Sequence, residues 1–165
     1  MFFLIFGMNN KNLYLDYLMI FGANYVIYLT LILIFIISLK GSISERKSLI
    51  LFLFSFPILI LIIKIIHLFI FEQRPFIEQD IIPLINQSAD AAFPSRHTAI
   101  MTTIIFSYIK SRWFPYLLAL GIWVGFARIY VGVHYPIDIL GGIITGLISL
   151  VVAKQIIKFL RNKLF

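Results

Sequence analysis

Residues 48–71 read SLILFLFSFPILILIIKIIHLFIF, an apolar run in which Lys64 is the only charged side chain. An α-helix rises about 1.5 Å per residue, so roughly 20 mainly apolar residues are needed to cross the hydrocarbon core of a bilayer. The run therefore predicts a membrane-spanning helix. Similar apolar runs recur near 17–39, 96–110, 113–133 and 136–158. We expect an all-α fold, a polytopic membrane helical bundle with about five transmembrane helices.

The composition also favours a membrane protein. Of the 165 residues, 61% are hydrophobic and 13% are charged, whereas a soluble domain has about 45–50% apolar and about 25% charged residues. A globule of this size cannot hide such an excess of apolar side chains. We predict a single integral membrane domain over residues 1–165. Cysteine is absent, which excludes disulfides and thiolate metal sites.

The first residues, 1–14, are too short to span and are expected to lie in the membrane interface. They lack a basic segment and a small-residue cleavage site, so no removed signal peptide is predicted.

The basic residues predict how the bundle is oriented. With five spans, the loop at 40–47, the turn at 110–112 and the tail from 154 share one side. Of the fourteen Lys and Arg residues, nine lie there: Lys40, Arg46, Lys47, Lys110, Arg112, Lys154, Lys158, Arg161 and Lys163. Only Glu45 of the seven acidic residues joins them. The positive-inside rule makes this side cytoplasmic, which accounts for the net charge of +7 without a nucleic-acid partner.

Three short polar segments fall at ends of apolar runs on the opposite, extracytoplasmic side. They are Arg74-Pro75, then Pro94-Ser95-Arg96-His97, then Arg128 with His134 and Asp138. Ionisable residues in such places are costly in a membrane, so the default interpretation is functional. Arginines, histidines and a serine together indicate a site for a phosphate group, with a nucleophile and an acid among them.

His134 and Asp138 are four residues apart, and Pro136 is suited to begin a helix. Side chains at this spacing lie about one turn apart. A carboxylate bonded to one imidazole nitrogen fixes the tautomer and leaves the other nitrogen free to attack an electrophile. The alternative is that His134 caps the helix while Asp138 is an acid favoured by the helix dipole.

The other two segments supply donors for an anion. Ser95, Arg96 and His97 stand at a predicted helix start, where unpaired N–H groups attract anions. The alternative there is an ordinary N-cap with an incidental histidine. Arg74 and Arg128 carry forked guanidinium groups that match phosphate oxygens, although Arg74 and Arg96 could also extend towards lipid headgroups.

Lys64 and His67 lie inside the second run. With Phe71 and Arg74 their 3-4-3 spacing predicts one shared helix face. We expect Lys64 to be buried or to line a cavity, and His67 to support the site; the alternative is that His67 binds the phosphate directly as a substrate-binding residue.

A metal site is the competing interpretation of the outward carboxylates. Mg²⁺ favours such ligands, but Glu72, Glu78, Asp80 and Asp90 show no metal motif in their spacing. Arginines already neutralise phosphoryl charge. We predict metal-free chemistry with no cofactor.

The ordered set Arg74-Pro75, Pro94-Ser95-x-His97 and Arg128-x5-His134-x3-Asp138 resembles the three-part signature of the type 2 phosphatidate phosphatase superfamily, the lipid phosphate phosphatases. The resemblance covers about residues 64–142. The stretches 71–76, 91–95 and 134–142 look most like the bacterial undecaprenyl-diphosphatase branch.

This resemblance implies a role for each site residue. His134 would be the nucleophile that becomes a phosphohistidine, Asp138 would orient it, and His97 would protonate the leaving oxygen and then activate water. The phosphoryl oxygens would be held by Arg74, Ser95 and Arg128. The implied substrate is undecaprenyl diphosphate, cleaved to the monophosphate carrier for cell-wall synthesis.

The chain departs from the family pattern at three positions. His67 stands where the first motif has Lys, Arg96 where the second has Gly, and Ala127 where the third has Ser. The Ala127 change removes a hydroxyl donor from the implied cradle. Arg96 is an added cation, and we expect it to bind the second phosphate of a diphosphate.

Other functions remain open at this stage. A phosphatidate or phosphatidylglycerol phosphate phosphatase would use the same residues, and a small transporter or channel subunit would instead depend on Lys64 and His67. For the enzyme we expect a multi-pass protein of the bacterial cytoplasmic membrane with its site facing outwards. Its partners would be an isoprenoid lipid diphosphate and membrane lipids, with no nucleic acid and no obligate protein partner.

Overall fold

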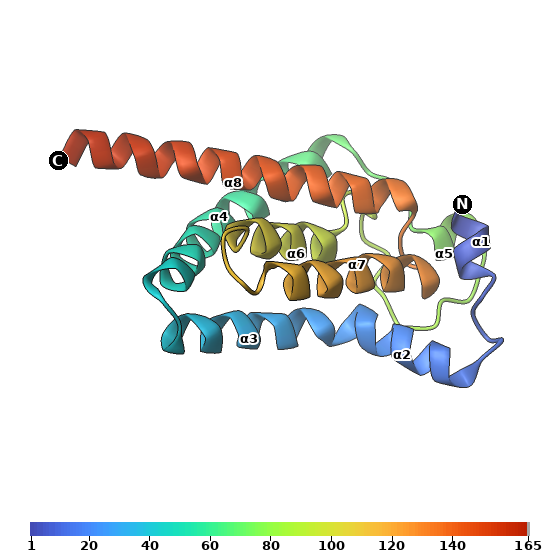
Figure 1. The fold of residues 1–165 in the computed structure, drawn as a ribbon. Helices are drawn as coiled ribbons and strands as arrows, with labels where there is room; N and C mark the ends of the chain where they lie inside the picture. The colour runs from blue at the N-terminus through green and yellow to red at the C-terminus, as the bar shows by residue number, and fades with distance from the viewer. Residues whose placement is uncertain (165) are drawn as a thin grey trace.

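The computed structural model describes residues 1–164, which contain helices and no β-strand (Figure 1). The helices are α1 (Phe2–Phe6), α2 (Leu13–Asn24), α3 (Val26–Lys40), α4 (Ile43–Phe69), α5 (Pro75–Glu78), α6 (Arg96–Ser107), α7 (Phe114–Tyr130) and α8 (Pro136–Leu164). The predicted all-α fold class is confirmed.

The helices differ in how far they could cross a membrane. Two of them are long and apolar enough on their own, α4 and the Pro136–Asn162 part of α8. The first predicted run is not one straight helix, because α2 begins at Leu13 and meets α3 at a 55° bend next to Tyr25. Two further helices, α6 and α7, have 12 and 17 residues, and α1 and α5 have five and four. A total of five spans therefore stays a prediction.

The structure contradicts two predictions about the second apolar run, one about where its helix ends and one about the burial of Lys64. The helix stops at Phe69, and Ile70 already has extended backbone angles. Phe71 and Arg74 consequently do not share a helix face with Lys64 and His67, and that prediction was wrong. The Lys64 side chain is exposed rather than buried, because its position on α4 faces away from the neighbouring helices.

The N-terminal residues were only partly anticipated. Residues 2–6 form α1, which packs on α7, and the buried ring of Phe2 lies 5.0 Å from that of Tyr135. Asn12 caps α2 by accepting hydrogen bonds from the backbone of Tyr14 and Leu15. The last residues of the segment 1–14 thus belong to the first long helix.

The centre of the bundle is α6, which packs against α4, α7 and α8. In a membrane, such packing depends on close approach of small residues more than on removal of apolar surface from water. A Cβ on Gly142 would lie 2.7 Å from the Ser95 carbonyl oxygen, and one on Gly146 would lie 2.7 Å from that of Ala99. Glycines therefore let α8 approach α6 closely at its first turns.

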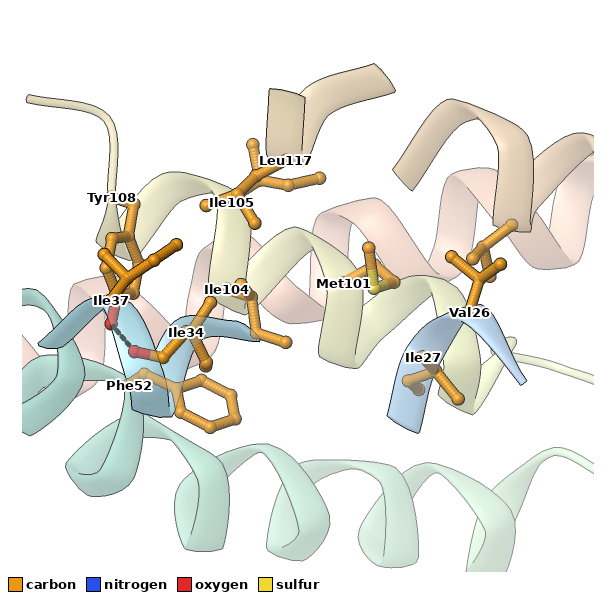
Figure 2. Packing of buried hydrophobic residues seen from close by; sticks show 11 residues of the cluster. Val26, Ile27, Ile34, Ile37, Phe52, Met101, Ile104, Ile105, Tyr108 and Leu117 are labelled. Carbon is orange, nitrogen blue, oxygen red and sulfur yellow. Dashed lines mark hydrogen bonds between the residues drawn. The ribbon is translucent and has the colours of Figure 1, made fainter. Parts of the chain in front are cut away.

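A second contact region joins α3, α4, α6 and α7. Figure 2 shows its buried side chains, which include Ile34 of α3, Phe52 of α4, Met101 of α6 and Leu117 of α7. The Tyr108 hydroxyl donates to the Ile34 carbonyl oxygen (3.3 Å) and also contacts Ser38 (2.6 Å). The hydroxyl groups of Tyr108 and Ser38 are thus paired inside the bundle.

The two ends of the bundle have different chemistry. The α3–α4 connection, the α6–α7 turn and the C-terminal end of α8 lie at one end (Figure 1, left). The basic residues that were predicted to share one side lie on these segments. The Lys163 side chain is outside the described part of the chain. The start of α8, α5 and the end of α7 lie at the other end, where the three polar segments meet.

Candidate active site

His134 and Asp138 form the buried centre of the site. The His134 Nδ1 lies 3.1 Å from Asp138 Oδ2, and the two side chains are 3% and 0% exposed. Gly132, with a φ of +84°, lets the chain reverse between α7 and α8. The same Asp138 Oδ2 accepts the backbone N–H of Tyr135 (2.8 Å). The expected contact across four residues is therefore present.

The neighbours of His134 also determine its tautomer. Its Nε2 lies 3.3 Å from Arg74 Nη1. A guanidinium group has donors only, so Nε2 must accept and Nδ1 must carry the proton that goes to Asp138. The Nε2 lone pair consequently faces the arginine side of the site.

The charge state of His134 follows from the same surroundings. Burial, and then the positive charges of Arg128 and Arg74, hold the pKa of His134 well below its usual range. The imidazole is therefore neutral at neutral pH. A neutral imidazole with one unprotonated ring nitrogen is the form that can act as a nucleophile.

Arg74 is held by groups on two sides. It is 1% exposed, and its Nε and Nη2 donate to Asp90 Oδ1 at 3.1 and 2.8 Å. Its Nη1 donates to the Val133 carbonyl oxygen at 3.1 Å. Arg74 precedes Pro75 at the start of α5, so a short helix start fixes its backbone. The headgroup alternative for Arg74 does not fit a side chain buried in this way.

Arg128 is buried with fewer partners. It is 2% exposed and near the end of α7, where Nη2 donates to Gln87 Oε1 (2.8 Å) and Nη1 reaches the Ala23 carbonyl oxygen (3.4 Å). Its Nε has no partner within the described residues. A buried charge without a counter-ion is costly. We therefore interpret Arg128 as part of a binding site for an anionic ligand.

Ser95 and His97 come from the start of α6. Ser95 is fully buried; its backbone N–H donates to the Asp138 carbonyl oxygen (3.0 Å) and its hydroxyl accepts from Thr98 (3.2 Å). It makes no side-chain cap. His97 is half-buried and lies within electrostatic range of the Arg128 charge and of the His134 ring. Both residues are thus beside the His134 pair.

Arg96 and His67 lie further out. The Arg96 side chain is 46% exposed and forms an ion pair with Asp90 Oδ2, so it points to a neighbouring carboxylate in place of lipid headgroups. His67 is half-buried and lies within range of the charges of Arg96 and Asp90. Its Nε2 is buried without a partner in the described part of the chain.

Two residues of the site were not anticipated in these roles. Asp90 joins Arg74 to Arg96, and Gln87 binds Arg128. Burial raises the pKa of the Asp90 carboxyl, but the hydrogen bond and charge of Arg74 outweigh it, so the net pKa lies below its usual value. Asp90 was considered only as a possible metal ligand. The one signal in the sequence was a carboxylate six residues before Arg96.

No group of three or more His, Asp or Glu side chains in residues 1–164 is arranged to hold a metal ion. The metal-free mechanism stays a prediction.

Comparison with known proteins places this arrangement in a family. The sequence profile of the PAP2 superfamily matches residues 48–161. The chain belongs to the PAP2 superfamily. The resemblance drawn from the three polar segments is confirmed, and the chain is a PAP2 membrane phosphatase, a hydrolase.

Two relatives of this PAP2 phosphatase are named for an isoprenoid diphosphate. Undecaprenyl-diphosphatase BcrC of Bacillus subtilis (strain 168) is 38% identical over 149 residues, which cover 87% of this chain and 76% of the relative. The putative undecaprenyl-diphosphatase YbjG of Escherichia coli (strain K12) is 33% identical over 102 residues, covering 60% and 51%.

A solved structure shows that the fold is shared. The crystal structure of Aquifex aeolicus LpxE superposes with a TM-score of 0.68 over 93% of this chain and 92% of that chain, at 23% identity.

Proposed function

We propose that this PAP2 phosphatase hydrolyses undecaprenyl diphosphate to undecaprenyl phosphate and inorganic phosphate through a phosphohistidine. The observation that carries the proposal is a neutral, buried imidazole whose lone pair faces the buried Arg74, with the buried Arg128 close enough for its charge to act on the ring. The names of the two relatives supply the lipid class. In this proposal the whole chain, 1–165, acts as one domain.

The first half-reaction begins at His134. Its Nε2 forms a bond to the terminal phosphorus, and the bond from that phosphorus to the bridging oxygen breaks. The imidazole gains positive charge as this occurs, and the carboxylate of Asp138, 3.1 Å from Nδ1, stabilises it. In this step His97 must enter as an imidazolium; it gives its proton to the departing oxygen of the lipid monophosphate and becomes neutral.

The second half-reaction restores the enzyme. Neutral His97 takes a proton from water, the water oxygen bonds to phosphorus, and the phosphorus–nitrogen bond breaks to release inorganic phosphate. The charge of the transferring group is held by Arg74, Arg128 and Ser95. Guanidinium groups in a buried site are effective there because they are already in place and are poorly screened.

The location of the site leads to a proposal about cellular function. Eight of the nine basic residues have described side chains at the opposite end of the bundle, which favours a cytoplasmic position for that end. The site then faces the outside of the bacterial cytoplasmic membrane. An enzyme there would return the lipid carrier after it has delivered a cell-wall precursor.

The test is phosphate release by the purified protein from a panel of undecaprenyl diphosphate, phosphatidate and phosphatidylglycerol phosphate. We expect the diphosphate to be preferred and activity to survive EDTA. His134→Ala should abolish release, while Lys64→Ala, which changes an exposed cation on α4, should not.

Two results would contradict the proposal. If the enzyme preferred phosphatidate or phosphatidylglycerol phosphate, its substrate would be a phospholipid and not an isoprenoid diphosphate. Dependence on Lys64 with indifference to His134 would support the transporter hypothesis instead.

A further inference from the structure

A basic groove lies between α4 and α8, at the end of the bundle away from the candidate site. It has a volume of about 500 Å³ and is lined by Lys47, Ile50, Leu51, Lys154, Ile157, Lys158 and Arg161. The first three residues belong to α4 and the other four to α8. Segments about 100 residues apart in sequence therefore form one concave surface.

The helical spacing accounts for this convergence. Residues 154, 157, 158 and 161 follow the i, i+3, i+4, i+7 pattern, so they share one face of α8. Residues 47, 50 and 51 likewise share a face of α4. The two helices pack together, and the end of α8 extends beyond the rest of the bundle (Figure 1). Both faces are thus turned towards the groove.

Within the described part of the chain, the four cations of the groove have no carboxylate partner. The ion pairs in the described residues all involve Asp90 or Asp138, at the other end of the bundle. Glu45, the one acid of this end, is buried and bonded to Ser42 and Ser111. The groove is therefore strongly positive and free to bind an anion.

The shape of the groove selects the kind of anion. Ile50, Leu51 and Ile157 give it an apolar floor, which a free phosphate ion would not use. Seven residues separate Lys154 from Arg161, so the cations extend along about 10 Å of α8. Basic pockets between membrane helices on the cytoplasmic side are suited to lipid headgroups. We propose that this groove binds an anionic phospholipid, its headgroup on the cations and its acyl chains on the apolar floor.

This site is separate from the proposed hydrolysis. It would bind a lipid of the leaflet opposite the candidate active site, and it contains none of the residues placed in the catalytic machinery. A test of lipid binding in this groove therefore does not depend on which substrate the enzyme hydrolyses.

Photo-crosslinking tests the groove directly. The protein is placed in phosphatidylcholine vesicles that contain a small fraction of photoactivatable phosphatidylglycerol, and the crosslinked residues are mapped by mass spectrometry. We expect crosslinks to concentrate at Ile50, Leu51 and Ile157, and unlabelled phosphatidylglycerol to compete with them. Photoactivatable phosphatidylcholine at the same fraction should label the whole lipid-facing surface evenly.

A matched pair of variants separates a groove from general attraction. Lys158→Gln with Arg161→Gln should lower the crosslinking yield at these residues by roughly tenfold or more, since each cation near a lipid surface contributes a several-fold effect. Arg46→Gln with Lys110→Gln removes the same charge from the same end outside the groove and should leave the yield unchanged. Even labelling by both lipids, or equal losses in both variants, would overturn the proposal.

Discussion

The Asp138 carboxylate provides the most discriminating perturbation of the proposed mechanism. Its Oδ2 accepts two hydrogen bonds, from His134 Nδ1 (3.1 Å) and from the Tyr135 backbone (2.8 Å), whereas its Oδ1 is buried without a partner in the described residues. Asp138→Asn can keep an oxygen at the Oδ2 position, because the Tyr135 N–H is a donor and requires an acceptor there. The amide then replaces only the unpartnered oxygen.

The size of each loss follows from these contacts. A hydrogen bond to a charged group is worth roughly 1.5–3 kcal/mol and a neutral one roughly 0.5–1.5 kcal/mol. Asp138→Asn should therefore cost about 1–1.5 kcal/mol in the transition state, or roughly five- to tenfold in kcat/KM. Asp138→Ala removes the whole interaction and should cost about 10- to 150-fold.

Steady-state phosphate release from undecaprenyl diphosphate gives both ratios. Asp138→Ala should also be less stable, because it leaves the Tyr135 N–H unpaired, and thermal unfolding measures that part separately. An Asp138→Asn loss as large as that of Asp138→Ala would refute the reasoning. A loss near the roughly 10⁴-fold seen when such a substitution reverses a histidine tautomer would show that the amide faces His134.

Three further predictions concern charge, specificity and orientation. ¹⁵N NMR should find His134 neutral at pH 6, and the variants His67→Gln and His97→Gln would assign the signals of the three histidines. Because His134 is neutral in the folded protein, only the unfolded state binds a proton at this residue. The free energy of unfolding should therefore fall as pH drops below about 6.5. Arg96→Gly should lower kcat/KM roughly tenfold more for the lipid diphosphate than for the monophosphate, and equal losses would exclude a role in that preference. The chain has no cysteine, so single cysteines can be introduced at two exposed positions as Asn86→Cys and Ser44→Cys. In intact cells whose outer barrier has been opened, an impermeant thiol reagent should label Asn86→Cys and not Ser44→Cys. The reverse result would place the site in the cytoplasm.

The sequence predicted those parts of the site that depend on regular spacing. His134 and Asp138 meet because four residues make about one helical turn, and the polar segments gather at one end because each terminates an apolar run. Arg74 was placed on α4 by the same rule, and this was wrong because extended backbone begins at Ile70. A helical period cannot report where the helix itself ends.

The partners of the arginines could not be predicted for a related reason. Gln87 and Asp90 lie in the irregular segment between α5 and α6, residues 79–95, which has no repeating pattern to fix its direction. The bend at Tyr25 likewise leaves no mark in a run that is apolar on both sides of it. These features depend on contacts between segments far apart in the chain.

The segment between α5 and α6 also supplies partners for the arginines of the site. Asp90 pairs with both Arg74 and Arg96, and Gln87 gives Arg128 a neutral acceptor. A buried cation that lost its partner would be strongly destabilising, so these contacts stabilise the buried arginines. A phosphate oxygen would need some of the same donors. Among the described residues Arg128 has an unpartnered Nε and no carboxylate partner, so it loses least by binding that oxygen. We therefore expect Arg128 to bind the transferring phosphoryl group first, and Arg74 to strengthen its contact as negative charge develops beside His134.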